Sequence, residues 1–214
     1  PGYGRCDVAT DLVQEMLLDL LLSKERMYNY MVRVGSARSN EHGGITGGKP
    51  GDQKGGAEVS MQAWYLHSKG WIVIRAKDPT AREKIATNME AGCRNNHIGY
   101  CQTHRTTATA AAKPFGYDLS KITKEVETDC SELVRVCCLY AGIQVGCFST
   151  GNEVAALQAT GHFEVLRDAK YCSSSEFLMR GDILVTKTKG HTVVVLDNGD
   201  NVLPEPEKKS GGRQ

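Results

Sequence analysis

The sequence predicts an α+β domain in which a buried helix packs against an antiparallel sheet, and three observations favour this class. The residues after Cys130 are apolar on nearly every side until Gly142, which is typical of a buried helix. Two strand-like runs at 182–187 and 191–196, joined by a short turn, predict an antiparallel pair. Apolar residues at helical spacing near the start of the chain predict additional N-terminal helices. We expect a sheet of roughly four to six strands.

The composition allows one substantial core and argues against a polymeric phosphate partner. The chain has 214 residues, of which 40% are hydrophobic and 24% charged, enough for one domain with a small extension. The formal net charge is +1 and the basic residues are dispersed, so we expect no nucleic-acid binding. We expect no cofactor.

The N-terminal segment predicts a packing helix. Thr10 or Asp11 can cap it, and Leu12, Met16 and Leu20 recur at helical spacing. The apolar run 12–22 is too short to cross a bilayer, and no basic region followed by an apolar region indicates a signal peptide. We therefore expect a helical extension at 1–33, a main domain at 34–203 and a flexible tail at 204–214.

The segment 34–56 is rich in Gly, Ser, Asn and Lys, so it is either a linker or a long ordered loop beside a groove. The aromatic residues that follow, Trp64, Tyr65 and Trp71, either pack in the core or stack on a ligand. Trp71 begins a predicted strand to residue 75. Asp78 and Pro79 then start a helix that ends between residues 92 and 95.

The remaining elements are shorter. Residues 108–112 predict the end of a helix, 151–160 a short helix and 163–166 a strand. Asn198 and Gly199 predict a type I′ hairpin turn after the strand 191–196. The eight cysteines have no paired C-x-x-C spacing, so we expect mostly free thiols, a reducing cytoplasm during synthesis and no metal site.

Cys130 is the candidate nucleophile. Thr128 or Asp129 caps its helix, and backbone N–H groups at a helix start stabilise a thiolate, so we expect a reactive thiol. His191, first on its strand, is the candidate base. A cysteine or a histidine found alone in such a place is more often a buried apolar side chain or a surface residue, but the two in this order are rarer. Cys101 lacks a helix-start position, so we prefer Cys130.

These residues carry a family resemblance. Asp-Cys-Ser at 129–131, Gly-Asp-Ile-Leu-Val at 181–185 and Gly-His-Thr-Val-Val-Val at 190–195 resemble the catalytic core of the NlpC/P60 and CHAP class of papain-like peptidoglycan hydrolases. With Gly-Gly-Lys-Pro-Gly-Asp-Gln at 47–53, the chain is similar to cell-wall hydrolases of phages and prophages of Gram-positive bacteria. The resemblance runs from about Gly35 to about Gly199, and implies a papain-like NlpC/P60 fold for the main domain, 34–203.

The resemblance also implies site residues. Tyr100 or Gln102 would donate to the oxyanion, and Asp129 and Ser131 would contact a stem-peptide amine, unless they serve only as turn or capping residues. Relatives place a third polar residue about a dozen positions after the histidine, but Leu203 stands there. The candidates that remain are Asp197, Asn201 and Glu205.

The implied function is hydrolysis of an amide bond in bacterial peptidoglycan through a thioester on Cys130, as an endopeptidase or an N-acetylmuramoyl-L-alanine amidase. Such a phage endolysin would be made in the host cytoplasm without a signal peptide and reach the wall through a holin or from the virion. The alternatives are a cysteine protease or acyltransferase acting on proteins, and a non-catalytic wall-binding or structural phage protein. The sequence leaves the bond cut and the oligomeric state open.

Overall fold

The computed structural model describes residues 13–14 and 31–202. The chain divides into two compact units, Pro1–Met31 and Val32–Gln214. Residues 13–14 are helical, and the rest of the predicted N-terminal helix, like the tail at 204–214, lies outside the described residues. The following account concerns the second unit.

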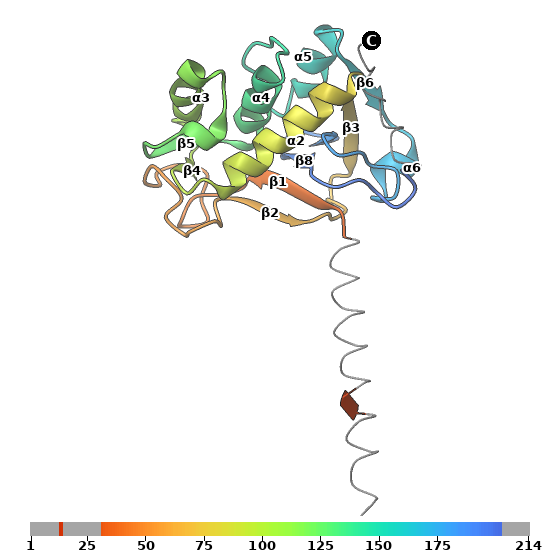
Figure 1. The fold of residues 1–214 in the computed structure, drawn as a ribbon, viewed down its shortest axis with the longest axis horizontal. Helices are drawn as coiled ribbons and strands as arrows, with labels where there is room; N and C mark the ends of the chain where they lie inside the picture. The colour runs from red at the N-terminus through yellow and green to blue at the C-terminus, as the bar shows by residue number, and fades with distance from the viewer. Residues whose placement is uncertain (1–12, 15–30, 203–214) are drawn as a thin grey trace, which may run out of the picture. The chain divides into compact units, whose positions relative to one another are not determined.

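The second unit is α+β (Figure 1). Its strands are β1 (Arg33–Ala37), β2 (Val59–Ala63), β3 (Trp71–Ala76), β4 (Ile98–Tyr100), β5 (Val126–Thr128), β6 (Phe163–Leu166), β7 (Ile183–Thr186) and β8 (Thr192–Val195). Its α-helices are α2 (Pro79–Arg94), α3 (Thr107–Ala112), α4 (Cys130–Tyr140), α5 (Glu153–Ala159) and α6 (Ala169–Cys172). Two 3₁₀ turns, Lys113–Phe115 and Leu119–Lys121, follow α3.

The main sheet has six strands in the order β2-β1-β8-β7-β3-β6, and every neighbouring pair is antiparallel. The prediction of an antiparallel sheet of this size is confirmed. The last described strand, β8, lies inside the sheet between β7 and β1, with Val34 opposite Val195. The strand that directly follows the candidate base, His191, is therefore held on both sides, and it begins at Thr192, one residue later than expected.

Strand β1 corrects the expected start of the Gly-rich loop, which we placed at residue 34. Gly35 and Ser36 have weak strand propensity, but both are buried in the sheet. A Cβ at Gly35 would lie 2.6 Å from Met89 Cγ of α2. The glycine therefore lets α2 pack closely on β1, a requirement that sequence propensity does not reveal.

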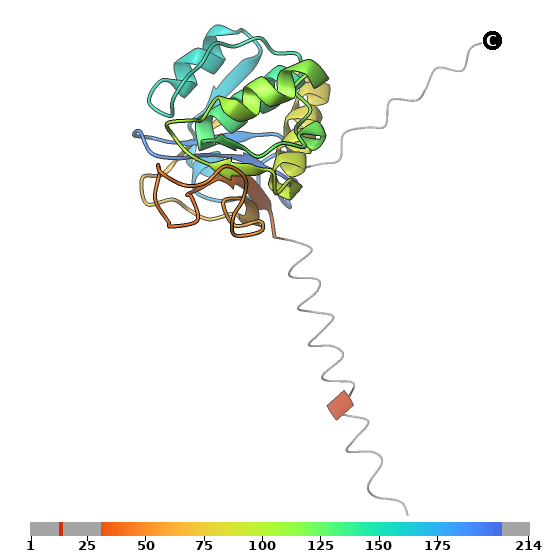
Figure 2. The ribbon, with the colours of Figure 1, turned by 90° about the vertical axis from the view of Figure 1, so that its left-hand side faces the viewer.

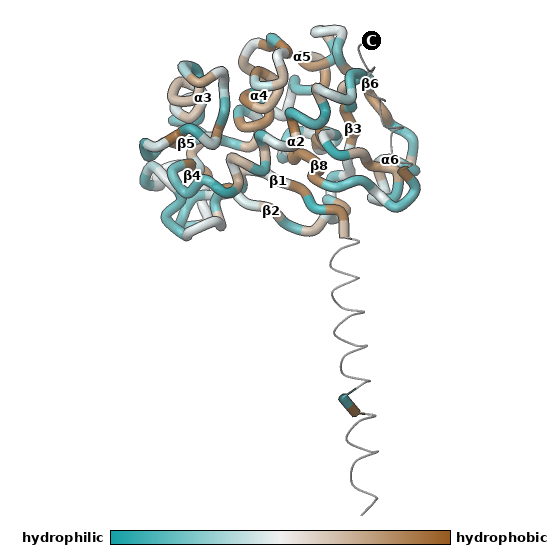
Figure 3. Tube along the Cα trace, viewed as in Figure 1, coloured by the Kyte–Doolittle hydropathy of each residue, from teal (hydrophilic) through white to brown (hydrophobic). Residues whose placement is uncertain are grey.

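The core lies on both faces of the sheet. Helices α2 and α4 cover one face, where Ile85, Met89 and Leu133 pack against Ile74 and other strand residues. On the other face Trp71 packs in a smaller cluster, and its Nε1 donates to the Tyr65 carbonyl at 2.8 Å. Trp71 is thus a core residue. Hydrophobic residues concentrate along the strands and α4, and the loops are hydrophilic (Figure 3).

A second, two-stranded parallel sheet is formed by β4 and β5. The long loop 38–58 lies beside it (Figure 2), because Gly51 N donates to the Val126 carbonyl at 3.1 Å. Tyr100 N donates to Glu58 Oε2 at 2.9 Å. Of the two interpretations of the Gly-rich segment, the ordered loop is confirmed.

Three further expectations have clear outcomes in the described part of the chain. The hairpin at Asn198 and Gly199 is wrong: Asn198 Oδ1 accepts from Arg180 N, Gly199 N donates to the Leu178 carbonyl, and no described strand follows. All seven cysteines of residues 31–202 are free. Among the described helices, none has the length and apolar character needed to cross a bilayer.

Candidate active site

Asp129 caps helix α4, as predicted. Its backbone is extended (φ −120°, ψ 177°), and its Oδ1 accepts from Glu132 N at 2.8 Å and from Ser131 Oγ at 3.1 Å. Such a cap satisfies N–H groups that a helix start otherwise leaves unpaired. Cys130 is consequently the first residue of α4, at the positive end of a helix of eleven residues.

Helix α4 packs against β8, and this contact brings the candidate nucleophile to the candidate base strand. Cys130 is buried, with 6% of the residue exposed, and the nearby backbone N–H of Thr192 acts to lower the pKa of its thiol. His191 immediately precedes Thr192. The His191 backbone is fixed by Thr186, whose Oγ1 accepts from His191 N at 3.0 Å and whose N donates to the His191 carbonyl at 3.0 Å.

The charge state of the pair corrects the expectation of a resting thiolate. Burial raises the pKa of Cys130 to about 12, and the negative charges of Asp129 and Glu153 add to this effect. Burial lowers the pKa of His191 to about 4, assisted by the nearby His67 and Arg38. Desolvation outweighs the helix terminus, so the resting site holds a neutral thiol and a neutral imidazole.

An open depression of about 370 Å³ lies in front of His191 and is lined by Arg38, Gln62, Tyr65 and His191. Tyr65 also senses Cys130, because a charge on that sulfur raises the tyrosine pKa, after the larger effect of burial. His191 lines this depression directly, whereas Cys130 is related to it only through Tyr65. Its other walls come from β2 and from the segments that follow β1 and β2.

Arg38 is a site residue that sequence reasoning missed. Its Nε and Nη2 are buried and have no hydrogen-bond partner in the described structure. Burial lowers its pKa, while Tyr65 acts in the opposite direction. A buried guanidinium with free donors is costly unless a ligand supplies acceptors. The sequence offered no signal, since Arg38 stands in a Gly- and Ser-rich segment.

The parallel pairing of β4 with β5 places Tyr100 opposite Thr128, two residues before Cys130. Gln102 Nε2 donates to the Tyr100 hydroxyl at 3.2 Å. Burial raises the pKa of Tyr100 to about 12, and the charges of Cys130 and Asp129 contribute to the rise. Tyr100 therefore keeps its proton at neutral pH and can donate a hydrogen bond near the nucleophile.

The candidates for a third catalytic residue lie away from His191. Asp197 accepts from Arg33 N and Arg33 Nε, both at 2.8 Å, at the far end of β8. Six residues of extended chain span roughly 20 Å. Asn201 Nδ2 donates to Glu176 Oε2 at 2.9 Å, and Glu205 lies outside the described residues. The placement of Asp197 and Asn201 argues against either one orienting the imidazole.

Asp129 and Ser131 are both engaged by Arg105. Arg105 Nη1 lies 3.2 Å from Asp129 Oδ2, and Arg105 Nη2 donates to Ser131 Oγ at 3.1 Å. Burial raises the pKa of Asp129 although the Glu132 N–H and Arg105 lower it. The capping role of Asp129 is confirmed, whereas its contact with a substrate amine stays a prediction.

Glu153 is a buried acid behind the nucleophile. Its Oε1 lies 2.7 Å from Thr192 Oγ1, which also lies 3.0 Å from the Leu184 carbonyl. A hydroxyl has one proton, so it cannot donate to both oxygens. A protonated Glu153 resolves this conflict by donating to Thr192, and burial raises the Glu153 pKa to about 8.

The family model for the endolysin-like domain matches residues 34–202. The chain belongs to the endolysin-like domain family. The match covers the domain from β1 to beyond β8 and includes both Cys130 and His191. Neither curated proteins nor solved structures give a significant match. An endolysin-like domain indicates a phage protein that lyses the bacterial cell wall, with peptidoglycan as its substrate.

Proposed function

We propose that this endolysin-like domain hydrolyses an amide bond of peptidoglycan, in the stem peptide or cross-bridge, with Cys130 as nucleophile and His191 as base. The observation that carries the proposal is the packing of α4 on β8, which sets the helix that begins with Cys130 against the strand that directly follows His191. A cysteine at a helix start and a histidine beside a strand start are the two groups that cysteine hydrolases use.

The first half of the reaction forms a thioester. His191 takes the Cys130 proton as the sulfur attacks the amide carbonyl, because the resting thiol and imidazole are both neutral. The carbonyl oxygen gains negative charge, and Tyr100, with its proton retained, donates to it. Collapse of the intermediate breaks the C–N bond, and the His191 imidazolium gives its proton to the leaving amine.

The second half uses water. His191, neutral again, takes a proton from a water molecule that attacks the thioester carbonyl. The C–S bond breaks, the acid product leaves and the sulfur regains its proton from His191. The reaction thus needs no group other than the chain and water.

Arg38 gives this site a recognition element. Arg38 lines the depression beside His191, and its Nε and Nη2 have no hydrogen-bond partner in the described structure. Together these two nitrogens match the two oxygens of a carboxylate. Peptidoglycan stem peptides offer free carboxylates close to their amide bonds. Arg38 would therefore hold a carboxylate of the substrate while Cys130 attacks a neighbouring carbonyl.

An NlpC/P60-like papain fold is part of the proposal. The support is the order of elements: a helix that begins with the nucleophile, then the antiparallel pair β7 and β8 with the histidine at the start of β8. Among the described residues neither Asp197 nor Asn201 is placed to serve as the expected third residue, so we propose a Cys130–His191 dyad. Thr186 fixes the backbone of the histidine in its place.

The test is mass spectrometry of purified peptidoglycan after digestion with the wild type, Cys130→Ala and His191→Ala. The proposal expects fragments from the wild type only, and the new amino terminus or free lactyl group identifies the bond. Cys147→Ala removes an exposed cysteine and should leave the digest unchanged. Blank wild-type digests across several wall chemotypes, or fragments that persist in Cys130→Ala, would refute the proposal.

A further inference from the structure

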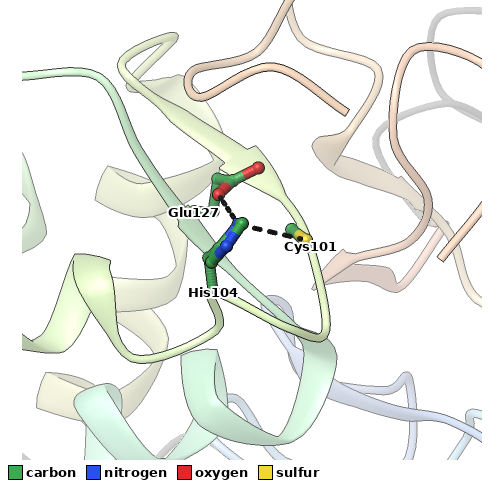
Figure 4. A group of neighbouring side chains, drawn as sticks. All are labelled: Cys101, His104 and Glu127. Carbon is green, nitrogen blue, oxygen red and sulfur yellow. Dashed lines mark hydrogen bonds and ion pairs between the residues drawn. The ribbon is translucent and has the colours of Figure 1, made fainter. Parts of the chain in front are cut away.

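A second polar cluster lies on the β4–β5 sheet and is not used by the proposed reaction. Cys101, directly after β4, His104, in the following turn, and Glu127 of β5 point toward one another (Figure 4). The His104 Nδ1 atom lies 2.9 Å from Glu127 Oε2 and 3.7 Å from Cys101 Sγ. One possible ligand atom from each side chain falls within 4.8 Å of the other two.

Glu127 points to an absent ligand. The residue is 2% exposed, and its Oε1 has no hydrogen-bond partner in the described structure. A buried carboxylate oxygen without a donor is costly. The Glu127 backbone is held firmly, since Thr107 Oγ1 accepts from its N–H at 2.8 Å and donates to its carbonyl at 3.0 Å. The carboxylate is therefore kept in this position.

The Cys101 sulfur is held in place beside the other two side chains. Thr103 Oγ1 lies 3.0 Å from Cys101 Sγ, within hydrogen-bond distance. Metals bind the thiolate, so Sγ is the ligand atom that Cys101 offers. Cys101 is 0% exposed, which leaves no access for a polymeric substrate and argues against a second nucleophile.

We propose that Cys101, His104 and Glu127 bind Zn²⁺ through Sγ, Nδ1 and a carboxylate oxygen, with a water molecule as fourth ligand. Zinc bond lengths of about 2.0–2.3 Å and tetrahedral angles place ligand atoms roughly 3.3–3.6 Å apart. The His104–Cys101 distance of 3.7 Å and the His104–Glu127 distance of 2.9 Å lie on either side of that range. The third separation, between Cys101 and Glu127, is within 4.8 Å, so small movements of the three side chains would bring the ligand atoms to tetrahedral spacing.

The mixed donor set selects the metal. A thiolate with an imidazole and one carboxylate suits Zn²⁺, whereas Mg²⁺ and Ca²⁺ prefer oxygen ligands. The His104 side chain is 64% exposed, so rotation of its ring opens a path from solvent to the buried sulfur and carboxylate. The bound ion would join the turn after β4 to β5, beside Tyr100 and the start of α4.

The experiment uses the full chain, kept reduced, stripped of metal and titrated with Co²⁺ or Zn²⁺ alone. We expect one equivalent of Co²⁺ with a sulfur-to-cobalt charge-transfer band and the strong visible bands of tetrahedral Co²⁺, displaced by Zn²⁺. Cys101→Ser, His104→Ala and Glu127→Gln should each weaken binding by at least about tenfold. His104→Ala removes an exposed side chain, so its result does not depend on a change in folding.

Matched controls separate this site from the proposed active site. Cys130→Ala, His97→Ala and Cys147→Ser should bind Co²⁺ as the wild type does, because none of these side chains belongs to the cluster. A wild type without the charge-transfer band would overturn the inference. The inference would also be overturned if Cys130→Ala abolished the charge-transfer band while Cys101→Ser left it unchanged. Since binding is read without peptidoglycan, failure of the hydrolase proposal leaves this test intact.

Discussion

Burial raises the pKa of Cys130 and lowers the pKa of His191, and the pH dependence of the activity should reflect both shifts. With the His191 pKa at about 4 and the Cys130 pKa at about 12, the neutral pair predominates across the physiological range. We expect kcat/KM on a soluble stem-peptide substrate to be nearly level from pH 5 to 8. It should fall below a pH of about 4 as His191 becomes protonated. An acid limb near the ordinary histidine pKa would contradict this prediction.

Glu153 makes stability depend on pH. Burial raises its pKa from 4.5 to about 8, so between these values the unfolded chain is ionised there while the folded chain keeps the proton. The stability contributed by this group is fully present below pH 4.5 and is lost as the pH rises through about 8.

Glu153→Gln removes that titration and keeps a donor for Thr192 Oγ1. We expect the variant to be more stable than the wild type at alkaline pH, by about 4 kcal/mol, and to match it near pH 4.5. Urea unfolding at both pH values measures the difference. A stability difference that is the same at both pH values would contradict the buried neutral acid.

Arg38 should affect substrate binding more than the chemical step. Loss of a charge-assisted hydrogen bond costs about 1.5–3 kcal/mol, so Arg38→Gln should raise KM roughly 10- to 100-fold with little change in kcat. The effect should disappear with a substrate whose carboxylate is replaced by a carboxamide. Lys54→Gln, which removes an exposed cation from the same loop, serves as control. An equal loss of kcat on both substrates would assign Arg38 another role.

At the residue scale, sequence motifs predicted Cys130, His191 and the cap at Asp129, because these depend on local order along the chain. The protonation state of Cys130 was predicted wrongly, since desolvation is set by the packing of α4 on β8 and not by neighbours in sequence. Arg38 was missed for a similar reason: its free donors are evident only after β1 is placed beside β8.

At the scale of elements, the contact between loop 38–58 and β4 depends on Gly99. A Cβ there would lie 2.1 Å from the Gly51 carbonyl oxygen. We expect Gly99→Ala to destabilise the domain by about 1–3 kcal/mol and to lower activity, because it displaces the loop from beside Tyr100. Thermal unfolding and peptidoglycan digestion measure the two effects.

Gly146→Ala is the control for this substitution. Gly146 is exposed and a Cβ there meets nothing within 4 Å, so its stability should stay within about 1 kcal/mol of the wild type. If Gly99→Ala and Gly146→Ala unfolded at the same temperature, the close approach of the loop to β4 would have no energetic role.

Helices α2 and α4 were predictable because each has a capping aspartate and a local apolar pattern. The strands β4 and β5 were not, since each has three residues and their partners are 28 positions apart, Ile98 opposite Val126. Pairing of such short strands depends on the loop that packs against them. The same holds for β1, whose glycine is explained only by Met89 of α2.

At the scale of the whole molecule, the described residues of both hydrophobic clusters all lie between Val32 and Leu196, within the second compact unit. We therefore expect a chain that begins at Val32 to fold cooperatively and to retain peptidoglycan hydrolysis. Calorimetry and digestion of this variant beside the full chain test the expectation. A broad, non-cooperative transition in the shortened chain would show that residues 1–31 are needed for folding.

The sequence predicted the fold class and the antiparallel sheet, but not the strand order. Order depends on contacts between segments far apart in the chain, such as β1 with β8, which no local pattern encodes. Of the candidates downstream of His191 for a third catalytic residue, Asp197 and Asn201 are both bound elsewhere, and Glu205 lies outside the described residues. One neighbour of β8 in the sheet is β1, which comes from the beginning of the domain.

The position of β8 also determines when the protein can become active during synthesis. Within the main sheet the hairpin of β1 and β2 is hydrogen-bonded to the other strands through β8 alone. Pairings between distant segments form late in folding, and a growing chain lacks β8 until residue 195 has been translated. His191 and the strand that joins β1 to β7 leave the ribosome together. A nascent chain without β8 would therefore have neither a complete sheet nor the proposed base.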